Sequence, residues 1–449
     1  MHITQNEVLE FVKESDIKFI RLNFCDILGF PKNISIMADE LQAAFETGVS
    51  FDAHAVKGFK DITRCDLFLF PDPATMAILP WRPGPGRVAR FYCDIKNPDG
   101  SLFLHDGRAL LKRAVEYAGK SGYSCKVGAE CEFYLFKTGG NGEPVGIPFD
   151  KGGYLDIAPF DRGEDIRREI CLTLEEMGIK PETSHHEQGP GQNEIDFEFS
   201  DAVTGADNLQ TFKSVVKAIA SRNGLFASFM PKPVLDAAGS GMHVNLSLAE
   251  NGNNIFRSTG EGHSNAAESF IAGILSKTGE ITAFLNPLVN SYESFGRFEA
   301  PKYISWSHQN RSQLIRIPAA AGTKARMELR SPDPALNPYL SFALIISSGI
   351  EGIEKNTPLP PALDVDLYTA DDHITKTLAT LPASLDEAVL LAENSRFVKN
   401  ILGEELLMKY LEIKKTEAQD FALACGTKEG GPKLEDKEKF YMERYFNII

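Results

Sequence analysis

Two glutamates alternate with apolar residues in one short stretch of the chain, and their spacing is the first sign of chemistry. Glu130 and Glu132 lie in the run from Gly128 to Phe136. Because side chains two positions apart in a β-strand point to the same side, both carboxylates share one face of the predicted strand. Two such carboxylates on an otherwise apolar strand repel each other. A cation must therefore lie between them, or one of them must bind a proton.

Three later stretches repeat this pattern of one apolar and one polar face. Their polar positions are Glu194, Asp196 and Glu198; His243, Asn245 and Ser247; and Arg326, Glu328 and Arg330. Alternation alone is typical of a half-buried strand whose polar face contacts water. Solvated strand faces favour Lys and Thr, however, whereas these four strands carry Glu, His, Asn and Arg. Together they predict a sheet with an apolar back and a charged, metal-binding front.

The acidic residues of these strands, with one more from the loop predicted at 184–191, form a candidate metal site. The candidate ligands are Glu130, Glu132, Glu187, Glu194, His243 and Glu328. Five carboxylates and one imidazole suit Mg²⁺ or Mn²⁺ better than zinc, which favours Cys and His. Six protein ligands exceed what one Mg²⁺ usually takes, so the sequence predicts two ions. Two close metal ions commonly bind phosphoryl oxygens.

Four arginines fall within twenty residues, in segments predicted as strands at 310–318 and 325–331. They are Arg311, Arg316, Arg326 and Arg330. Guanidinium groups fit phosphate and carboxylate, although they could equally pair with the acidic surface of this chain. Beside a two-metal carboxylate site, nucleotide phosphate is the better interpretation. The chain has no P-loop and no kinase-type glycine loop, so ATP must bind on another scaffold.

Length, charge and cysteine content exclude several classes of protein. At 449 residues the chain is long enough for two or more domains, and its net charge of −15 argues against nucleic acid and anionic membranes as main partners. Seven cysteines without a CxxC motif fit a reducing cytoplasm rather than a disulfide framework. The polar N-terminus does not fit a signal peptide, and the apolar run at 339–350 is too short to span a bilayer.

The order of predicted elements favours an α+β fold in two domains. Residues 1–103 read as a small β-rich domain that ends after a turn at 97–100. Residues 104–449 read as a larger catalytic domain, in which an antiparallel, metal-bearing sheet is surrounded by helices. Helices are predicted at 5–14, after Asp106, around 166–177 and 209–219, at 266–285 and 339–351, and through most of the C-terminal part.

Five ordered motifs resemble those of type I bacterial glutamine synthetase, and the similarity covers nearly the whole chain. The motifs lie at 128–133, 185–195, 232–243, 310–318 and 328–334. The resemblance implies an N-terminal β-grasp domain and a ring dodecamer with active sites between neighbouring subunits. It also implies the reaction: glutamate attacks the γ-phosphate of ATP, and ammonia then displaces phosphate from γ-glutamyl phosphate.

The resemblance also implies a role for each matching residue. One metal ion would be held by Glu132, Glu187 and Glu194, and the other by Glu130, His243 and Glu328. The nucleotide site would contain Glu182, Phe199, Asn245, Ser247 and Arg326. Arg311 and Arg316 would neutralise the transferring phosphate, while Arg330 and Gly239 would hold the amino acid. Asp52 of a neighbouring subunit would help deprotonate ammonium, beside Tyr154 and Glu187, and Glu299 would lie on a flap over the glutamate.

The chain departs from the family pattern in the acceptor pocket. Ala238 stands where an Asn usually contacts glutamate, and Ser294 stands where an Arg usually binds its carboxylate. Ala53, His54 and Ala55 replace the Gly-Ser-Ser that often follows Asp52. We expect Arg297 to reach the site in place of the lost Arg. If Arg297 points to solvent instead, glutamate should bind weakly, and another acid or amine could be preferred.

These departures leave alternatives open. The chain could be a related ligase that uses another amine, as in γ-glutamyl-polyamine synthesis, or another acid. It could also be a catalytically weak relative that binds nucleotide, but six intact ligand positions argue against that reading. Tyr368 lies where adenylylated members carry their modified Tyr, but the Leu-Pro-Pro that follows it there is missing. We therefore expect no adenylylation.

Overall fold

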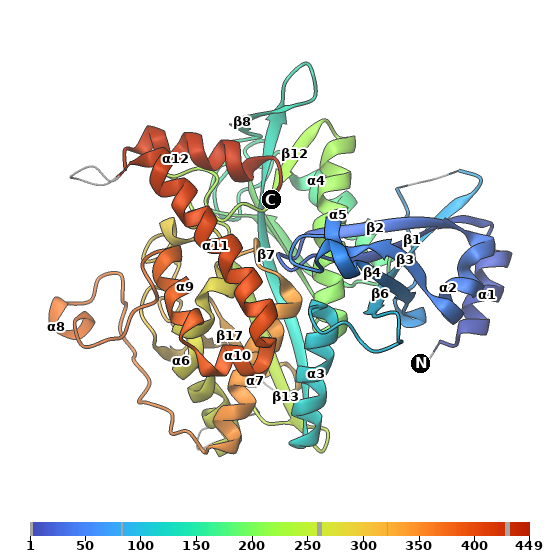
Figure 1. The fold of residues 1–449 in the computed structure, drawn as a ribbon. Coiled ribbons are helices and arrows are strands. Elements are labelled where there is room, and N and C mark those ends of the chain that lie inside the picture. Colours follow the sequence, from blue (N-terminus) through green and yellow to red (C-terminus); the bar gives the residue numbers. More distant parts are fainter. Residues whose placement is uncertain (1–2, 82–83, 258–262, 321, 427–431) are drawn as a thin grey trace.

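The computed structural model describes residues 3–81, 84–257, 263–320, 322–426 and 432–449. It contains two sheets with helices packed around them. In Figure 1 the N-terminal strands lie on the right in blue, the C-terminal helices lie on the left in orange and red, and the long strand β7 stands between them. Among the described residues, no helix is both long and apolar enough to cross a membrane.

The N-terminal sheet has the strand order β2-β1-β6-β4-β3, with β5 beside β6. Its strands are β1 (Ile17–Cys25), β2 (Pro31–Met37), β3 (Val49–Asp52), β4 (Asp66–Pro71), β5 (Ala77–Ile78) and β6 (Arg87–Lys96). The helices α1 (Gln5–Glu14) and α2 (Leu41–Thr47) accompany it. The predicted first helix has the predicted bounds, because Thr4 and Glu7 form a capping box at its start. This sheet is the N-terminal, β-rich part of the expected α+β fold.

The second sheet has the order β15-β16-β17-β13-β7-β10-β9, and four further strands pair with β7 or β13. Its strands are β7 (Tyr123–Thr138), β8 (Pro144–Pro148), β9 (Pro181–His186), β10 (Gln192–Phe197), β11 (Ser200–Asp201), β12 (Leu225–Ser228), β13 (Met242–Glu250), β14 (Asn253–Asn254), β15 (Trp306–His308), β16 (Ile315–Ile317) and β17 (Met327–Leu329). The pairings are antiparallel except between β15 and β16, which are parallel.

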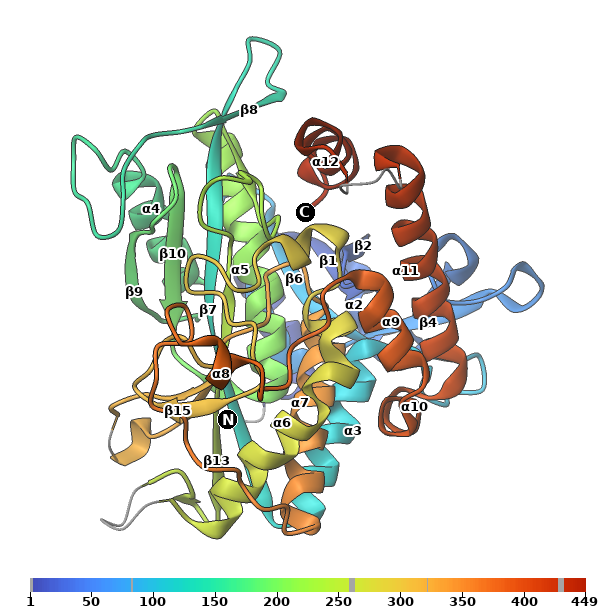
Figure 2. The same ribbon diagram turned by 90° about the vertical axis from the view of Figure 1, so that its left-hand side faces the viewer.

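Helices cover the second sheet and extend away from it. They are α3 (Gly107–Lys120), α4 (Glu164–Glu176), α5 (Ala202–Arg222), α6 (Asn265–Leu285), α7 (Pro338–Glu354), α8 (Asp372–Thr375), α9 (Leu385–Glu393), α10 (Arg396–Leu402), α11 (Glu404–Cys425) and α12 (Leu434–Tyr441). Phe212 of α5 packs against Phe133 of β7 and Phe197 of β10, at ring distances of 6.1 and 5.6 Å. The apolar back of the sheet is therefore buried against α5, whose place beside β7 is visible in Figure 2.

Some predicted bounds differ from those of the structure. The loop predicted at 184–191 begins as strand β9, which pairs with β10 so that His185 lies opposite Glu194. The strands predicted at 310–318 and 325–331 shorten to three residues each, β16 and β17. The first is shorter because the Asn310 side chain accepts a hydrogen bond from the Ser312 amide at 3.0 Å, and this local turn replaces strand pairing.

Arg108 of α3 joins the two parts of the chain. Its guanidinium lies 2.8 Å from Asp94 of β6, 2.9 Å from Asp72 just after β4, and 2.9 Å from Asp207 of α5. Arg108 and Asp207 are both buried. β6 ends at Lys96 and α3 begins at Gly107, so the boundary that we propose at residue 103 lies between elements held together by this arginine.

We expect Arg108→Met to lower the free energy of unfolding by about 3 kcal/mol, because it leaves the buried Asp207 carboxylate without its cation. Urea unfolding of the full chain measures this change. Arg113→Met, at an exposed position of the same helix, is the control. Equal unfolding midpoints for the two variants would show that the cluster around Arg108 contributes nothing to stability.

Candidate active site

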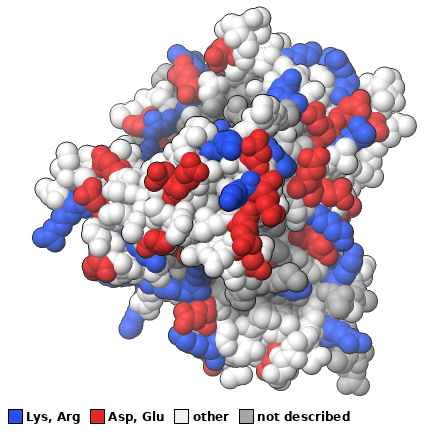
Figure 3. Space-filling model, turned by 90° about the vertical axis from the view of Figure 1, so that its right-hand side faces the viewer, with Lys and Arg blue, Asp and Glu red and all other residues white. Residues whose placement is uncertain are grey.

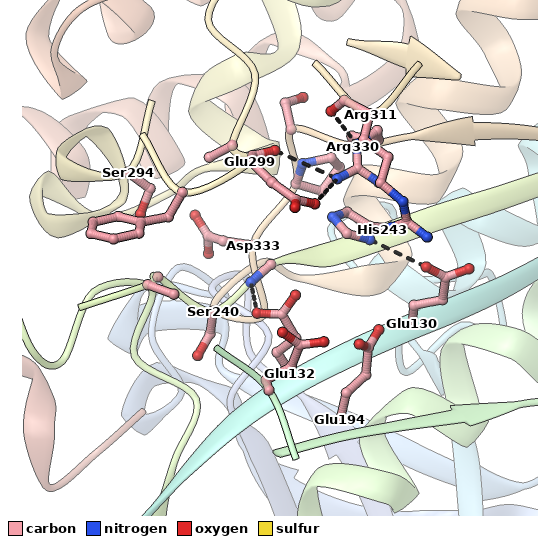
Figure 4. Close-up of a pocket in the computed structure, with 18 of the residues that line it drawn as sticks. Glu130, Glu132, Glu194, Ser240, His243, Ser294, Glu299, Arg311, Arg330 and Asp333 are labelled. Atoms are coloured by element: carbon pink, nitrogen blue, oxygen red, sulfur yellow. Dashed lines mark hydrogen bonds and ion pairs between the residues drawn. The ribbon is translucent and has the colours of Figure 1, made fainter. Parts of the chain in front are cut away.

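A cavity of about 580 Å³ opens on the polar front of the second sheet. Most of the residues singled out from the sequence line it: Glu130, Glu132, Tyr154, Glu187, Glu194, Gly239, His243, Glu299, Arg311, Arg316, Arg326 and Arg330. Figure 4 shows Glu130, Glu194 and His243 toward one end of this cavity and Ser240, Ser294 and Asp333 toward the other. The cavity thus has a carboxylate-rich end and an end that contains several serine hydroxyls.

Strand register places the carboxylates side by side. Glu132 lies opposite Glu194 between β7 and β10, while Glu130 lies opposite His243 between β7 and β13. The His243 Nδ1 atom is 3.2 Å from the Glu130 carboxylate, and the Asn245 amide donates to the same carboxylate at 2.8 Å. Period-two alternation and pairing with β7 therefore put these side chains on one face.

The buried carboxylates lack enough positive charge around them. Burial, with the charge of Glu187 next, raises the pKa of Glu132 well above its usual range. Burial and the charge of Glu132 raise the pKa of Glu194 in the same way. Although burial opposes it, the hydrogen bond from His243 lowers the pKa of Glu130 to about 2. A divalent cation would relieve this repulsion, so the residues present fit a metal site.

The ligand-type atoms fall into two overlapping groups. Glu130, Glu194 and His243 each place one such atom within 4.8 Å of the others, and so do His185, Glu187 and Glu194. These groups differ from the two sets that the resemblance implies, since His185 joins the second group, Glu194 is in both, and Glu132 and Glu328 join neither. Both groups offer oxygen and imidazole nitrogen, the donors that Mg²⁺ and Mn²⁺ accept.

Glu328 differs from the other proposed ligands because two arginines already contact it. Its side chain is fully buried on β17, with Arg316 on one carboxylate oxygen and Arg330 on the other. The His243 Nδ1 atom is 3.8 Å away. This buried carboxylate therefore positions both guanidinium groups along the wall of the cavity.

The residues expected at a nucleotide site continue from the carboxylates along β13. The Arg326 Nε atom, at the cavity wall, donates to the Asn245 side chain at 2.7 Å. Asn245 of β13 lies opposite Gly128 of β7, and Ser247 follows two residues later on β13. The Phe199 side chain packs against Gly128. Phe199, Asn245, Ser247 and Glu182 lie outside the cavity lining. The Glu182 carboxylate is 3.6 Å from the Lys324 ammonium.

The opposite end of the cavity contains Ala238 and Ser294, the two residues that depart from the family pattern in the sequence. A Cβ atom at Gly239 would lie 2.4 Å from the Ser294 hydroxyl and 2.8 Å from the Pro231 carbonyl, so only glycine fits there. The Ser240, Ser294 and Ser331 hydroxyls are buried and have no hydrogen-bond partner among the described residues. Since buried polar groups are normally hydrogen-bonded, these hydroxyls are suited to contact a polar ligand.

A loop with strained backbone lies over this end. Phe298 and Glu299 have φ angles of 48° and 64°, which non-glycine residues rarely adopt. The Glu299 carboxylate is 3.8 Å from Arg330, and Gln188 donates to it at 3.3 Å. Arg297 is exposed and outside the cavity lining.

Asp52 is also outside this cavity. It ends β3 of the N-terminal sheet, where its exposed carboxylate accepts a hydrogen bond from the His54 amide at 2.9 Å. Figure 3 shows acidic and basic side chains interspersed over the side of the molecule that carries this sheet.

Sequence reasoning missed several lining residues. Gln192 donates to Glu132 at 2.7 Å and to the Gly239 carbonyl at 2.9 Å, and thereby connects the two ends of the cavity. His185 lies 3.5 Å from Glu187 and 3.4 Å from Glu194. Gln192 shares the strand period of Glu194 and could have been found from it. Asn286 and Asp333 carry no such signal, because distant segments bring them to the cavity.

Comparisons with known proteins show which proteins this chain resembles. The family model described as the catalytic domain of glutamine synthetase matches residues 104–429, and the model of its β-grasp domain matches residues 16–98. The glutamine synthetase of Methanosarcina mazei is 48% identical, covering 93% of this chain and 95% of that protein. The one from Clostridium saccharobutylicum is 45% identical, covering 93% and 96%. A solved structure of a GmaS–ADP complex has a TM-score of 0.86 at 30% identity, covering 95% of this chain and 98% of that one.

Proposed function

Because the chain belongs to the glutamine synthetase family, we propose that the cavity of the second sheet is where it joins ammonia to glutamate. The protein is an ATP-dependent glutamate–ammonia ligase, which forms glutamine. Enzymes of this family use ATP and a divalent metal. The observation that carries the proposal is one cavity with buried carboxylates at one end, arginines along its wall and unpartnered hydroxyls at the other end.

We propose that two or more Mg²⁺ or Mn²⁺ ions bind at the carboxylate end. Glu130, Glu132, Glu187, Glu194, His243 and Glu328 would hold them. Such ions would screen the phosphate charge of ATP and so permit attack by a carboxylate. The nucleotide would extend toward Asn245, Ser247, Phe199, Arg326 and Glu182, and the ADP complex of the related GmaS structure supports a nucleotide site on this fold.

The arginines and the flap have separate proposed roles. Arg311 and Arg316 would stabilise the charge on the transferring phosphoryl group, while Arg330 and Gly239 would hold glutamate with its γ-carboxylate toward the nucleotide. Glu299 would close over the bound amino acid and exclude water from γ-glutamyl phosphate. Tyr154 would lie beside the ammonium site.

We further propose a homo-oligomer, a dodecamer by family resemblance, with active sites between subunits. Asp52 is exposed and outside its own chain's cavity, which fits a carboxylate offered to a neighbouring subunit, where it would help deprotonate ammonium. The seven cysteines are all unpaired, which supports a reducing compartment such as the cytoplasm.

Phosphate release measured over a panel of acids and amines tests the proposed function. Glutamate with ammonium should give the highest kcat/KM, with glutamine as the product. No turnover with this pair, together with clear turnover of a polyamine or another acid, would favour the related-ligase alternative that Ala238 and Ser294 leave open.

We propose that Arg297 contacts glutamate once the flap closes, and we expect Arg297→Ala to raise the KM for glutamate about tenfold. Ser294 and Phe298, on either side of it in the chain, line the cavity, whereas Arg297 itself is exposed and outside the lining, so this contact requires the loop to move. A charge-assisted hydrogen bond is worth about 1.5–3 kcal/mol, or roughly 10- to 150-fold in affinity. Initial rates at saturating ATP measure the change. An unaltered glutamate KM would remove Arg297 from the acceptor site.

Tyr368 should carry no AMP in protein purified from nitrogen-replete cells. Its amide donates to the Asp366 side chain at 2.9 Å in a local turn. Although the residue is 39% exposed, partial burial raises the pKa of its phenol above the usual range, which disfavours the phenolate that would attack a nucleotide. Intact mass spectrometry tests this prediction, and an added AMP mapped to Tyr368 would contradict it.

A further inference from the structure

A buried pair, Asp150 and His186, lies directly beneath the segment that carries Glu187. The His186 side chain is fully buried, and Asp150 is 7% exposed. The His186 Nε2 atom is 2.9 Å from the Asp150 carboxylate, and its Nδ1 atom is 2.7 Å from the backbone carbonyl of Glu187. A carboxylate and a carbonyl oxygen only accept hydrogen bonds, so both ring nitrogens donate here. The imidazole thus connects Asp150 to the backbone of Glu187.

Asp150 also holds three backbone amides from two different loops. It accepts from Gly152 at 3.3 Å and from Arg162 at 3.0 Å, near the two ends of loop 151–162. It accepts from Gly191 at 2.8 Å, at the end of the turn that follows Glu187. A Cβ atom at Gly152 would lie 2.8 Å from the His186 ring, so a glycine lets this loop approach the imidazole. One carboxylate therefore fixes both segments relative to each other.

The backbone around Glu187 is held on both sides. Its carbonyl accepts from His186, and its own amide donates to the Gln192 carbonyl at 2.9 Å. The Glu187 carboxylate also accepts from the Gln188 amide at 2.9 Å. These contacts leave the side chain little freedom to move away from Glu194 and His185. His186 is the most buried member of this group.

The same residues could be mistaken for a second metal site. Ligand-type atoms of Asp150, Asp161 and His186 lie within 4.8 Å of one another, and all three residues are buried. Asp161, however, is 2.6 Å from the Arg167 guanidinium and accepts from the Gly163 amide at 2.8 Å. Asp150 already accepts from His186 and three amides. Because protein donors already satisfy the carboxylate oxygens of Asp150 and Asp161, the cluster is a hydrogen-bonded network and not a cation site.

We propose that Asp150 and His186 are a positioning pair that fixes the Glu187 carboxylate for metal binding and couples metal affinity to loop 151–162. The inference rests on the proposed metal role of Glu187. The loop carries Tyr154, which lines the cavity, and the Leu155 amide donates to the His186 carbonyl at 3.1 Å. Groups that orient a metal ligand through a hydrogen bond commonly change metal affinity 10- to 100-fold when they are replaced.

Titration of the full chain with Mn²⁺ in the absence of substrates, followed by electron paramagnetic resonance, tests the pair without an activity assay. We expect Asp150→Asn and His186→Gln each to raise the Mn²⁺ Kd about 10- to 100-fold. A glutamine at 186 can donate to Asp150 or to the Glu187 carbonyl, but it cannot replace both ring contacts in their present geometry. Glu417→Gln is the matched control, because Glu417 is a buried carboxylate on α11 that accepts from Lys414 at 2.9 Å and from Tyr445 at 2.6 Å.

An unchanged Mn²⁺ Kd in a folded Asp150→Asn variant would overturn the inference. If neither variant folds while Glu417→Gln does, the pair serves folding in place of positioning, and the inference is also overturned. The proposed metal site is tested separately by Glu187→Ala. If that variant binds Mn²⁺ as tightly as the unaltered chain, the metal role of Glu187 fails, and the inference fails with it.

Discussion

Replacing His243 or Glu132 with alanine is expected to abolish ATP turnover while the fold stays intact. Both residues belong to the carboxylate end of the cavity, where His243 lies 3.2 Å from Glu130 and Glu132 lies opposite Glu194. Without a bound cation, the charge on the ATP phosphates would repel the attacking carboxylate. Metal ions contribute several kcal/mol at such centres, so we expect kcat to fall by at least about 1000-fold.

Phosphate-release assays measure ATP turnover, and circular dichroism of the same preparations measures whether each variant is folded. The increase in Tm on adding Mn²⁺ should also be smaller, since a ligand that binds only the folded state stabilises it and each variant weakens one of the two ion sites. Glu250→Ala is a suitable control because Glu250 is exposed at the far end of β13, the strand that carries His243. Turnover near that of the unaltered chain in folded His243→Ala or Glu132→Ala would refute the two-metal site.

The polar front of the second sheet could be predicted from the sequence because residues two positions apart in a strand lie on the same face of the folded sheet. Glu130 and Glu132 share a face, and so do His243 and Asn245, since both contact the Glu130 carboxylate. Period-two patterns depend only on local backbone geometry, which the chain carries in every strand. Pairing between strands then aligns residues more than a hundred positions apart, and ligand-type residues at matching positions in four strands made that alignment predictable.

Other parts of the site depend on tertiary contacts that leave no periodic signal. Asp150 and His186 are 36 positions apart and meet only because β9 and the loop after β8 pack together. The flap has no alternation, so the positive φ angles at Phe298 and Glu299 were not predictable from residue type. The grouping of His185 with Glu187 and Glu194 also depends on β9 pairing with β10, in a segment whose sequence favours a loop.

Arg311 offers the clearest test of phosphoryl-group stabilisation, because its guanidinium has no ion-pair partner among the described residues. Its side chain is exposed and lines the cavity, while its backbone carbonyl accepts from Arg330 at 3.1 Å. Arg316, in contrast, contacts the buried Glu328, so replacing it would also leave a buried carboxylate with less compensation. A change at Arg311 should therefore alter charge stabilisation without disturbing the sheet.

We expect Arg311→Ala to lower kcat by about 10³- to 10⁵-fold, the range found for arginines that stabilise a transferring phosphoryl group. Arg311→Lys should recover only part of the activity, since an ammonium keeps the charge but lacks the planar fork. Arg113→Ala, at an exposed arginine of α3, should leave kcat unchanged. If Arg311→Ala raises only the KM for ATP and leaves kcat intact, Arg311 contributes only to ground-state binding. The role in phosphoryl transfer would then belong to Arg316, which contacts one carboxylate oxygen of Glu328 while Arg330 contacts the other.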